Sequence, residues 1–202
     1  MIKEAEPQVD LFELRIDLIG AGWPDLATGL KKPWIACARS KAEGGNWPGD
    51  DAEKTEELIT ATELGADMVD IELGTTNLAE AITLIKKKAK CLLSLHELEK
   101  TPPLEQLKGI VKRQLSAGAD ICKVVTTAQS PADNLTTLKL IAEFPKVKMV
   151  SFAMGPMGLV SRILCPLVGG YFTYASLAEG KESASGQLTV DQLKRIYRMM
   201  TR

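Results

Sequence analysis

The chain has 202 residues, of which 45% are hydrophobic and 25% charged, a composition typical of a globular protein with one core. We therefore expect a single domain over residues 1–202. Lysine and arginine total 25 against 26 aspartates and glutamates, so no excess charge indicates a nucleic acid or a membrane surface as partner. A small molecule is the expected partner.

Two further features bear on the compartment. No apolar run approaches the roughly 18 to 20 residues of a membrane span, and residues 1–10 lack the apolar core of a signal peptide. The cysteines lie far apart and have none of the paired spacings of zinc sites or redox motifs: Cys37, Cys91, Cys122 and Cys165. We expect a cytoplasmic protein with buried free thiols.

Short runs of β-branched and apolar residues alternate along the chain with longer segments of helical periodicity. Strands are predicted for residues 11–18, 34–39, 68–73, 91–96, 121–126, 147–153 and 171–176. Helices are predicted for residues 51–64, 77–88, 104–117, 131–143, 158–164 and 189–200. Gly65 and Gly118 stand where two of these helices should end.

Strands that alternate with helices predict a parallel sheet, and a regular series of such units favours a closed (β/α)8 TIM barrel over an open doubly wound sheet. Seven strands are identifiable, one fewer than the barrel needs. The missing first βα unit would precede residue 10, where residues 1–8 can supply the end of a helix but not a strand as well. We therefore expect an N-terminally short barrel, explained by a late start assignment, a true truncation, or another segment or subunit that fills the gap.

Polar side chains recur near the carboxyl ends of the predicted strands. Both faces of a parallel barrel strand are buried, so a charge there needs a partner or a ligand. Each residue alone could be an ordinary rim residue, but a set of buried charges is tolerated mainly where the charges pair with each other or with a substrate. These residues predict a ligand site at the C-terminal face of the barrel: Glu13, Arg15, Arg39, Asp70, Glu72, Ser94, His96 and Lys123.

Three of these residues suggest specific chemistry. The apolar neighbours of Lys123 would desolvate its ammonium and leave more free amine to attack a carbonyl, although a lysine at a strand end can also reach solvent. His96, the only histidine, is a candidate for proton transfer or a plain core residue. Glu13 lies two residues from Arg15 on one strand face, where the two could form an ion pair facing a ligand.

The loops carry weaker signals. The sequence GPMG at 155–158 precedes a predicted helix with Ser161 and Arg162, so backbone N–H groups, the helix dipole and a guanidinium could bind a carboxylate or phosphate; an ordinary turn is the alternative. Residues 43–51 and 179–187 are polar, as active-site loops and plain surface loops both are. Neither loop has the ending of a nucleotide-binding loop.

Taken together, seven motifs resemble the type I 3-dehydroquinate dehydratase family, the Schiff-base-forming (β/α)8 barrels of the shikimate pathway. They are ELRIDL at 13–18, ARSKAEGG at 38–45, VDIEL at 69–73, SLHELEKTP at 94–102, GADICKV at 118–124, GLVSRIL at 158–164, and FTYASL at 172–177 followed by SASGQ at 183–187. The resemblance extends from about residue 10 to about residue 190 and implies a lyase that converts 3-dehydroquinate to 3-dehydroshikimate. It implies no metal or other cofactor, and a homodimer.

The resemblance also assigns roles to residues. Lys123 is implied as the Schiff-base lysine, and His96 as the proton-transfer residue with Glu43 beside it. The implied substrate-binding residues are Glu13, Arg15 and Arg39 for the hydroxyls, Arg162 for the carboxylate, and Ser183 with Gln187 on a loop that closes over the substrate. Glu72 is expected only at the rim of the site.

Two other functions stay open from the sequence. A strand lysine would also serve a class I aldolase of the same barrel type, which would act on a sugar phosphate. A non-catalytic relative that binds and senses a pathway metabolite is the alternative from another class. Ligand binding without turnover would identify that relative.

Overall fold

The computed structural model describes residues 2–200, and their fold is α/β. Six strands form one sheet within this part of the chain, in the order β1-β2-β3-β4-β5-β6. Their bounds are β1 Phe12–Arg15, β2 Trp34–Cys37, β3 Met68–Glu72, β4 Lys90–His96, β5 Ile121–Thr127 and β6 Met149–Met154. The pairings of β1 with β2, β2 with β3 and β3 with β4 are parallel. Because neighbours in the sheet are also neighbours in sequence, the connections between them carry the helices.

The chain divides into two compact units, which are described separately. The β1–β4 unit comprises residues 10–98 and 109–123, and the β6 unit comprises residues 2–9, 99–108 and 124–200. Helix α6 (Leu104–Ala117) and strand β5 each contribute residues to both units.

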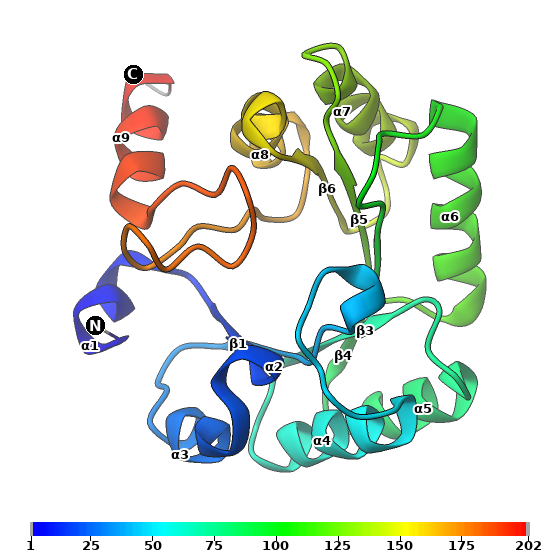
Figure 1. Ribbon diagram of the computed structural model, residues 1–202, viewed down its shortest axis with the longest axis vertical. Helices are drawn as coiled ribbons and strands as arrows, with labels where there is room; N and C mark the ends of the chain where they lie inside the picture. The colour runs from blue at the N-terminus through cyan, green and yellow to red at the C-terminus, as the bar shows by residue number, and fades with distance from the viewer. Residues whose placement is uncertain (1, 201–202) are drawn as a thin grey trace. The chain divides into compact units, whose positions relative to one another are not determined.

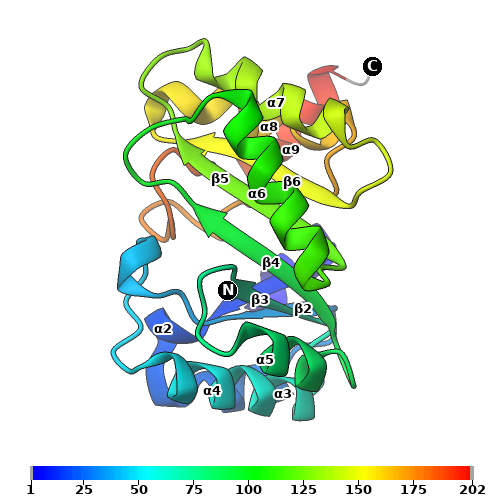
Figure 2. The same ribbon diagram turned by 90° about the vertical axis from the view of Figure 1, so that its right-hand side faces the viewer.

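In the β1–β4 unit, helices α3 (Trp23–Thr28), α4 (Asp51–Glu63) and α5 (Leu78–Ile85) lie on one face of strands β1–β4 (Figures 1 and 2). Helix α4 begins at a capping box, in which the Asp50 side chain accepts from the Glu53 N–H at 2.9 Å and the Glu53 side chain accepts from the Asp50 N–H. The strand starts are fixed by aspartates: Asp67 accepts from the Trp34 N–H at 3.0 Å and Asp120 from the Cys91 N–H at 2.8 Å. These two hydrogen bonds help to fix the positions at which β2 and β4 begin.

The β6 unit packs α7 (Asp133–Glu143) and α8 (Leu159–Leu164) against β6, and it also contains α1 (Ile2–Ala5) and α9 (Val190–Met200). Its core includes Val125, Val150 and Phe152. A buried amide joins its helices, since Asn134 Nδ2 donates to the Met157 carbonyl at 2.6 Å and Asn134 Oδ1 accepts from the Ser161 N–H at 2.8 Å.

Short helices complete the two units. They are α2 (Ile16–Ile19), η2 (Gly20–Gly22) and η3 (Lys41–Glu43) in the β1–β4 unit, and η1 (Glu6–Gln8), η4 (Pro156–Gly158) and η5 (Pro166–Val168) in the β6 unit. Gly65 and Gly118 follow α4 and α6 with φ of 91° and 100°, so the predicted helix ends are confirmed.

The predicted seventh strand, residues 171–176, is wrong. The Tyr171 N–H donates to the Met149 carbonyl at 2.7 Å, but Ser176 forms only an isolated bridge with Thr189. Tyr171, Phe172 and Tyr174 instead pack ring against ring, with centroids of successive rings 5.4 Å apart. Aromatic residues favour strands only where a partner strand offers a ladder, and here aromatic packing takes its place.

The first predicted strand is shorter than expected, because helix α2 begins at Ile16 and ends the strand at Arg15. Helices α2 and α3, between β1 and β2, were not predicted. Residues 2–8 form α1 and η1, in agreement with the expected absence of a strand there. None of the helices in residues 2–200 combines the length and apolar character needed to cross a membrane. All four cysteines are buried and free, as predicted.

Candidate active site

Lys123 lies on β5 with 6% of its side chain exposed, in contact with carboxylates from two other strands. Its Nζ atom donates to Asp70 Oδ2 on β3 at 2.7 Å and lies 3.7 Å from Glu13 Oε1 on β1. Glu13 Oε1 is buried and accepts no hydrogen bond from the described residues. The amine is thus held at a fixed point, facing two carboxylates.

Arg39, just after β2, is buried and binds side chains on two neighbouring strands, β3 and β4. Its Nη2 lies 2.7 Å from Asp70 Oδ1, and its Nη1 donates to Ser94 Oγ at 2.6 Å and to Glu72 Oε1 at 3.4 Å. Ser94 in turn donates to Asp70 Oδ1 at 2.6 Å. Burial alone would raise the pKa of Asp70, but Arg39 and Lys123 outweigh it and hold the pKa well below its usual value.

His96, at the end of β4, is paired with Glu43 on η3. Its Nδ1 lies 2.8 Å from Glu43 Oε2, and its backbone N–H donates to the same oxygen at 3.1 Å. Because Oε2 already accepts from the backbone, Nδ1 is best assigned as a second donor, which leaves Nε2 as the basic nitrogen. The pair can therefore accept a proton at one defined atom.

The pKa values of this pair both favour the uncharged forms. Burial lowers the pKa of His96 well below 6.5, and the positive charges of Arg39 and Lys123 lower it further. Burial also raises the pKa of Glu43 to about 8; Glu72 and Asp70 add to this rise, while Arg39 opposes it. A neutral imidazole at neutral pH is the form that a general base requires.

The turn that carries Glu43 is tightly closed. The Gly45 N–H donates to the Ser40 carbonyl at 2.8 Å, and the Trp47 N–H donates to the Arg39 carbonyl at 3.0 Å. A Cβ atom on Gly45 would lie 2.2 Å from the Arg39 carbonyl oxygen, so only glycine fits there. The short distance along the chain from Arg39 to Glu43 is thereby fixed.

Arg15 does not form the expected ion pair with Glu13. Its Nε and Nη2 donate to the two carboxylate oxygens of Asp17 at 2.8 and 2.7 Å. The chain turns into α2 directly after Arg15, which brings Asp17 beside it, and Glu13 faces Lys123 instead. Burial opposes protonation of Arg15, but the hydrogen bonds that it donates to Asp17 raise its pKa above the usual value.

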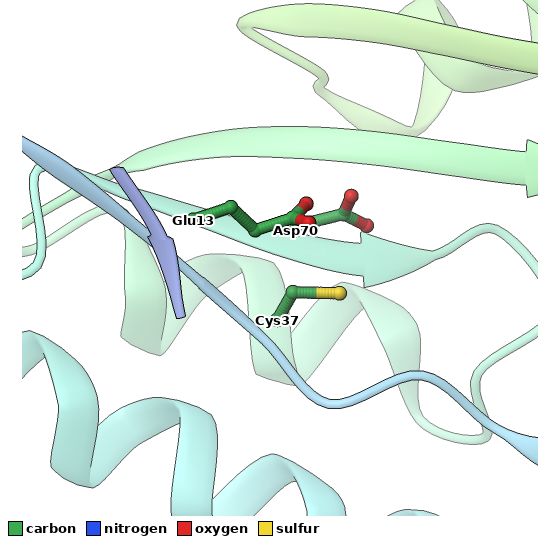
Figure 3. A group of neighbouring side chains, drawn as sticks. All are labelled: Glu13, Cys37 and Asp70. Carbon is green, nitrogen blue, oxygen red and sulfur yellow. The ribbon is translucent and has the colours of Figure 1, made fainter. Parts of the chain in front are cut away.

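Glu13, Cys37 and Asp70 are the group in the described residues most suited to a metal ion, with ligand atoms within 4.8 Å of one another (Figure 3). Their chemistry does not favour one. Both Asp70 oxygens already accept hydrogen bonds, and the nearby Lys123 ammonium would repel a cation. Burial raises the pKa of Cys37 far above neutrality, so its sulfur stays a thiol.

Arg162, on α8 in the β6 unit, is 1% exposed, and its guanidinium carbon lies 4.2 Å from the centroid of the Phe152 ring. Its Nε and Nη2 are buried and donate no hydrogen bond to the described residues. Burial lowers the pKa of Arg162 to about 10. A buried guanidinium with unused donors fits a planar anion such as a carboxylate.

Ser183 and Gln187 belong to one loop of the β6 unit. Gln187 Oε1 accepts from the Ser183 N–H at 2.8 Å and from Ser183 Oγ at 3.3 Å. The same loop reaches the turn before α8, where the Gly155 N–H donates to the Ser185 carbonyl at 3.2 Å. A Cβ atom on Gly186 would lie 2.6 Å from the Gly155 carbonyl oxygen.

Ser161 is not available to a ligand. Its Oγ donates to the Gly158 carbonyl and accepts from the Ala153 N–H, at 2.8 and 2.9 Å. The GPMG segment is a tight turn that packs against β6, since a Cβ atom on Gly158 would lie 2.3 Å from the Ala153 carbonyl oxygen. Of the two side chains predicted there, only Arg162 has buried donors that find no acceptor in the described residues.

A family model described as type I 3-dehydroquinase matches residues 1–202. The chain belongs to the type I 3-dehydroquinase family. A 3-dehydroquinate dehydratase of Dehalococcoides mccartyi is 49% identical to this chain over 187 residues, which cover 93% of the chain and 84% of the relative. One from Methanocaldococcus jannaschii is 38% identical over 206 residues, 98% of this chain and 92% of the relative. The crystal structure of 3-dehydroquinate dehydratase from Geobacillus kaustophilus matches with a TM-score of 0.88 at 28% identity, covering 99% of this chain and 85% of that one.

For this member of the type I 3-dehydroquinase family, the predicted residues fall into two groups. The β1–β4 unit brings together Glu13, Arg15, Arg39, Glu43, His96 and Lys123, and the β6 unit contains Arg162, Ser183 and Gln187. Glu72, expected at the rim, is 4% exposed and binds Lys54.

Sequence reasoning missed the buried Lys54, and it underestimated Asp70, which binds Lys123, Arg39 and Ser94. A signal for Lys54 existed. Lys54 shares one face of α4 with the buried Leu58, Ala61 and Thr62, so a charged residue lies within the buried face of that helix.

Proposed function

We propose that this chain dehydrates 3-dehydroquinate to 3-dehydroshikimate through a Schiff base on Lys123, with His96 as general base and acid. One observation carries the proposal: a buried lysine amine and a buried histidine held neutral lie in one compact unit, in a chain of this family. The curated relatives are named for the same reaction.

The first step is addition of the Lys123 amine to the C3 ketone of the substrate. A C–N bond forms and the carbonyl oxygen leaves as water, whose two hydrogens come from the Lys123 ammonium. The product is an iminium that draws electrons from the adjacent C2–H bond. Asp70 and Glu13 face the position of the iminium nitrogen and would stabilise its positive charge.

The second step is elimination of water. His96 Nε2 removes the proton from C2, and the electron pair of that bond forms the C1–C2 double bond as the C1 hydroxyl departs. His96 returns its proton to the departing hydroxyl, so water leaves. Glu43 holds the imidazole ring through Nδ1, and hydrolysis of the iminium releases the product and the amine.

Further residues are proposed for substrate binding. Arg162 would bind the carboxylate, supported by its unused buried donors, and Glu13 would accept from a hydroxyl, supported by a buried oxygen that accepts no hydrogen bond from the described residues. Arg15 and Arg39 are proposed for the hydroxyls while they remain paired with Asp17 and Asp70. Ser183 and Gln187 would lie on the loop that covers the substrate.

At the level of the fold, we propose that residues 1–202 form a single domain of the (β/α)8 barrel type. The parallel pairing of β1 to β4 and the TM-score of 0.88 to a relative support it. The four buried free thiols support a cytoplasmic location.

We further propose a homodimer. Leu135, Met157 and Val160 are 58, 51 and 53% exposed and lie on α7, η4 and α8, three elements that contact one another. Exposed apolar side chains on neighbouring elements support a symmetric interface there. Light scattering should give twice the chain mass, and Val160→Glu should shift the mass toward the single chain. A concentration-independent single-chain mass for the unaltered protein would contradict the homodimer.

The test of the reaction is borohydride reduction in the presence of 3-dehydroquinate, followed by intact-mass and peptide analysis. We expect one substrate-derived adduct, on Lys123, and none on Lys123→Ala. A folded protein that forms no adduct and no product would contradict the proposal. Binding of substrate without turnover would instead identify a metabolite-binding relative.

A further inference from the structure

Lys54 lies on α4 with 1% of its side chain exposed, yet it is none of the residues that would touch the substrate. Its Nζ lies 2.7 Å from Glu72 Oε2 on β3 and 2.7 Å from Asp51 Oδ1, three residues earlier on its own helix. An ammonium buried this deeply is costly to desolvate, so its position needs a reason.

Glu72 connects Lys54 to the turn that carries Glu43. While Oε2 binds Lys54, Oε1 accepts from the Ser40 N–H at 2.8 Å and from Arg39 Nη1 at 3.4 Å. Ser40 is the residue from which η3 begins, and Glu43 is the last residue of η3. The backbone of that short helix is thus anchored to a carboxylate that Lys54 holds.

The same carboxylate affects the balance of charge around Arg39. Arg39 Nη1 lies 3.4 Å from Glu72 and 3.5 Å from Glu43, but its shortest contacts are to Ser94 and Asp70, at 2.6 and 2.7 Å. Without the Lys54 charge, Glu72 would be a buried carboxylate with Arg39 as its nearest cation. The guanidinium would then be drawn toward Glu72 and away from Asp70.

We infer that Lys54 is a positioning residue for proton transfer: through Glu72 it fixes the Ser40 turn and the Arg39 guanidinium, and thereby the Glu43–His96 pair. This inference rests on the proposed function. Lys54 touches none of the groups that would bond to the substrate, so its main effect should fall on the proton-transfer step. Any effect on substrate affinity, through the proposed contact of Arg39 with the hydroxyls, should be smaller.

Two variants of Lys54 and one control test the inference. Lys54→Met removes the charge and the donor, and Lys54→Gln keeps a donor for Glu72 without the charge. The control is Lys108→Met, because Lys108 also bridges two carboxylates, Glu105 and Glu143, each at 3.0 Å, but neither belongs to the network of Glu72 and Arg39.

We expect Lys54→Met to lower kcat by about tenfold, less than the roughly hundredfold or greater effect of a general base itself, with KM little changed. Borohydride should still trap substrate on Lys123 in this variant. The deuterium isotope effect of C2-labelled substrate on kcat should increase, because removal of that proton becomes slower. Lys54→Gln should show the same pattern to a lesser extent, and Lys108→Met should leave kcat and the isotope effect unchanged.

The outcomes separate this inference from the proposed function. An unaltered protein without turnover and without an adduct would remove the proposed function, and the inference with it. An active unaltered protein with a folded Lys54→Met variant of normal kcat would overturn the inference alone. If Lys54→Met does not fold, a folded Lys54→Gln variant with normal kcat and an unchanged isotope effect would overturn the inference equally. A Lys54 variant whose only change is a raised KM would also overturn the inference.

Discussion

Asp70 Oδ2 accepts a hydrogen bond from Lys123 Nζ at 2.7 Å, and the other oxygen of the same carboxylate lies 2.7 Å from Arg39 Nη2. One buried carboxylate on β3 therefore sets the positions of both the proposed nucleophile on β5 and the guanidinium after β2. Its two oxygens also make it the residue whose neutralisation should have the widest effect in the β1–β4 unit.

Asp70→Asn should reduce both stability and activity. The amide cannot balance two cations, and breaking a buried ion pair costs about 3 to 5 kcal/mol of the free energy of unfolding. Urea unfolding measures this loss, with Asp120→Asn as the control. Asp120 pairs with Lys86 at the surface, where such a pair contributes about 1 kcal/mol or less. Equal losses in the two variants would contradict the structural role of Asp70.

Lys123→Ala should abolish turnover without unfolding the protein. Asp70 keeps Arg39 and Ser94 as partners after the change, so its buried carboxylate is still paired with a cation and hydrogen-bonded. Product formation and the far-ultraviolet circular dichroism spectrum are the two measurements. A variant with a rate close to that of the unaltered protein would remove the Schiff base from the mechanism.

Arg162→Met should weaken substrate binding and leave the free energy of unfolding equal or higher. The guanidinium is buried with two nitrogens that find no acceptor in the described residues, and replacing such a group by an apolar one of similar size removes a desolvation cost. Steady-state kinetics should show a raised KM. A large loss of stability, or an unchanged KM, would place the carboxylate elsewhere.

His96 should make the stability depend on pH below 6.5. The unfolded imidazole gains a proton near pH 6.5 but the folded one does not, so the histidine's contribution is present above that pH. It is lost as pH falls toward the folded pKa, by about 1.4 kcal/mol per pH unit. In His96→Gln this dependence should disappear.

Glu43 should change the free energy of unfolding with pH in the opposite direction to His96. Its folded carboxyl keeps a proton that the unfolded one releases above pH 4.5, so its contribution falls as pH rises toward about 8. Because Glu43 is present in both proteins, the difference between them reports on His96. Identical slopes of the free energy of unfolding against pH would show that the folded imidazole titrates normally.

The regular parts of the fold were predictable from sequence because each depends on a local signal. Apolar β-branched runs predicted β2 to β6 to within a few residues, and Gly65 and Gly118 marked two helix ends. The segment from Tyr171 to Ser176 carried the same kind of signal and failed, because a strand also needs a neighbour that offers its backbone.

The candidate site was predictable for a different reason. Strand positions predicted Lys123 and His96 as site residues, and the family motifs added Glu43. No local pattern, however, tells which carboxylate faces which cation. Arg15 is the example. It pairs with Asp17 and not with Glu13, because α2 begins one residue after Arg15. Lys54 was not predicted as a buried residue because a lysine in an amphipathic helix is usually solvated.

The closed turn between Arg39 and Gly45 has a consequence for how the family can diverge. Any residue inserted there would move the Arg39 guanidinium away from the Glu43 carboxylate that holds His96. Any side chain at position 45 would clash with the Arg39 carbonyl oxygen. Changes in loop length between β2 and α4 should accordingly be tolerated only beyond Trp47. Among relatives that keep this proton-transfer pair, the number of residues from Arg39 to Gly45 should be invariant, while the stretch that follows is free to grow or shrink.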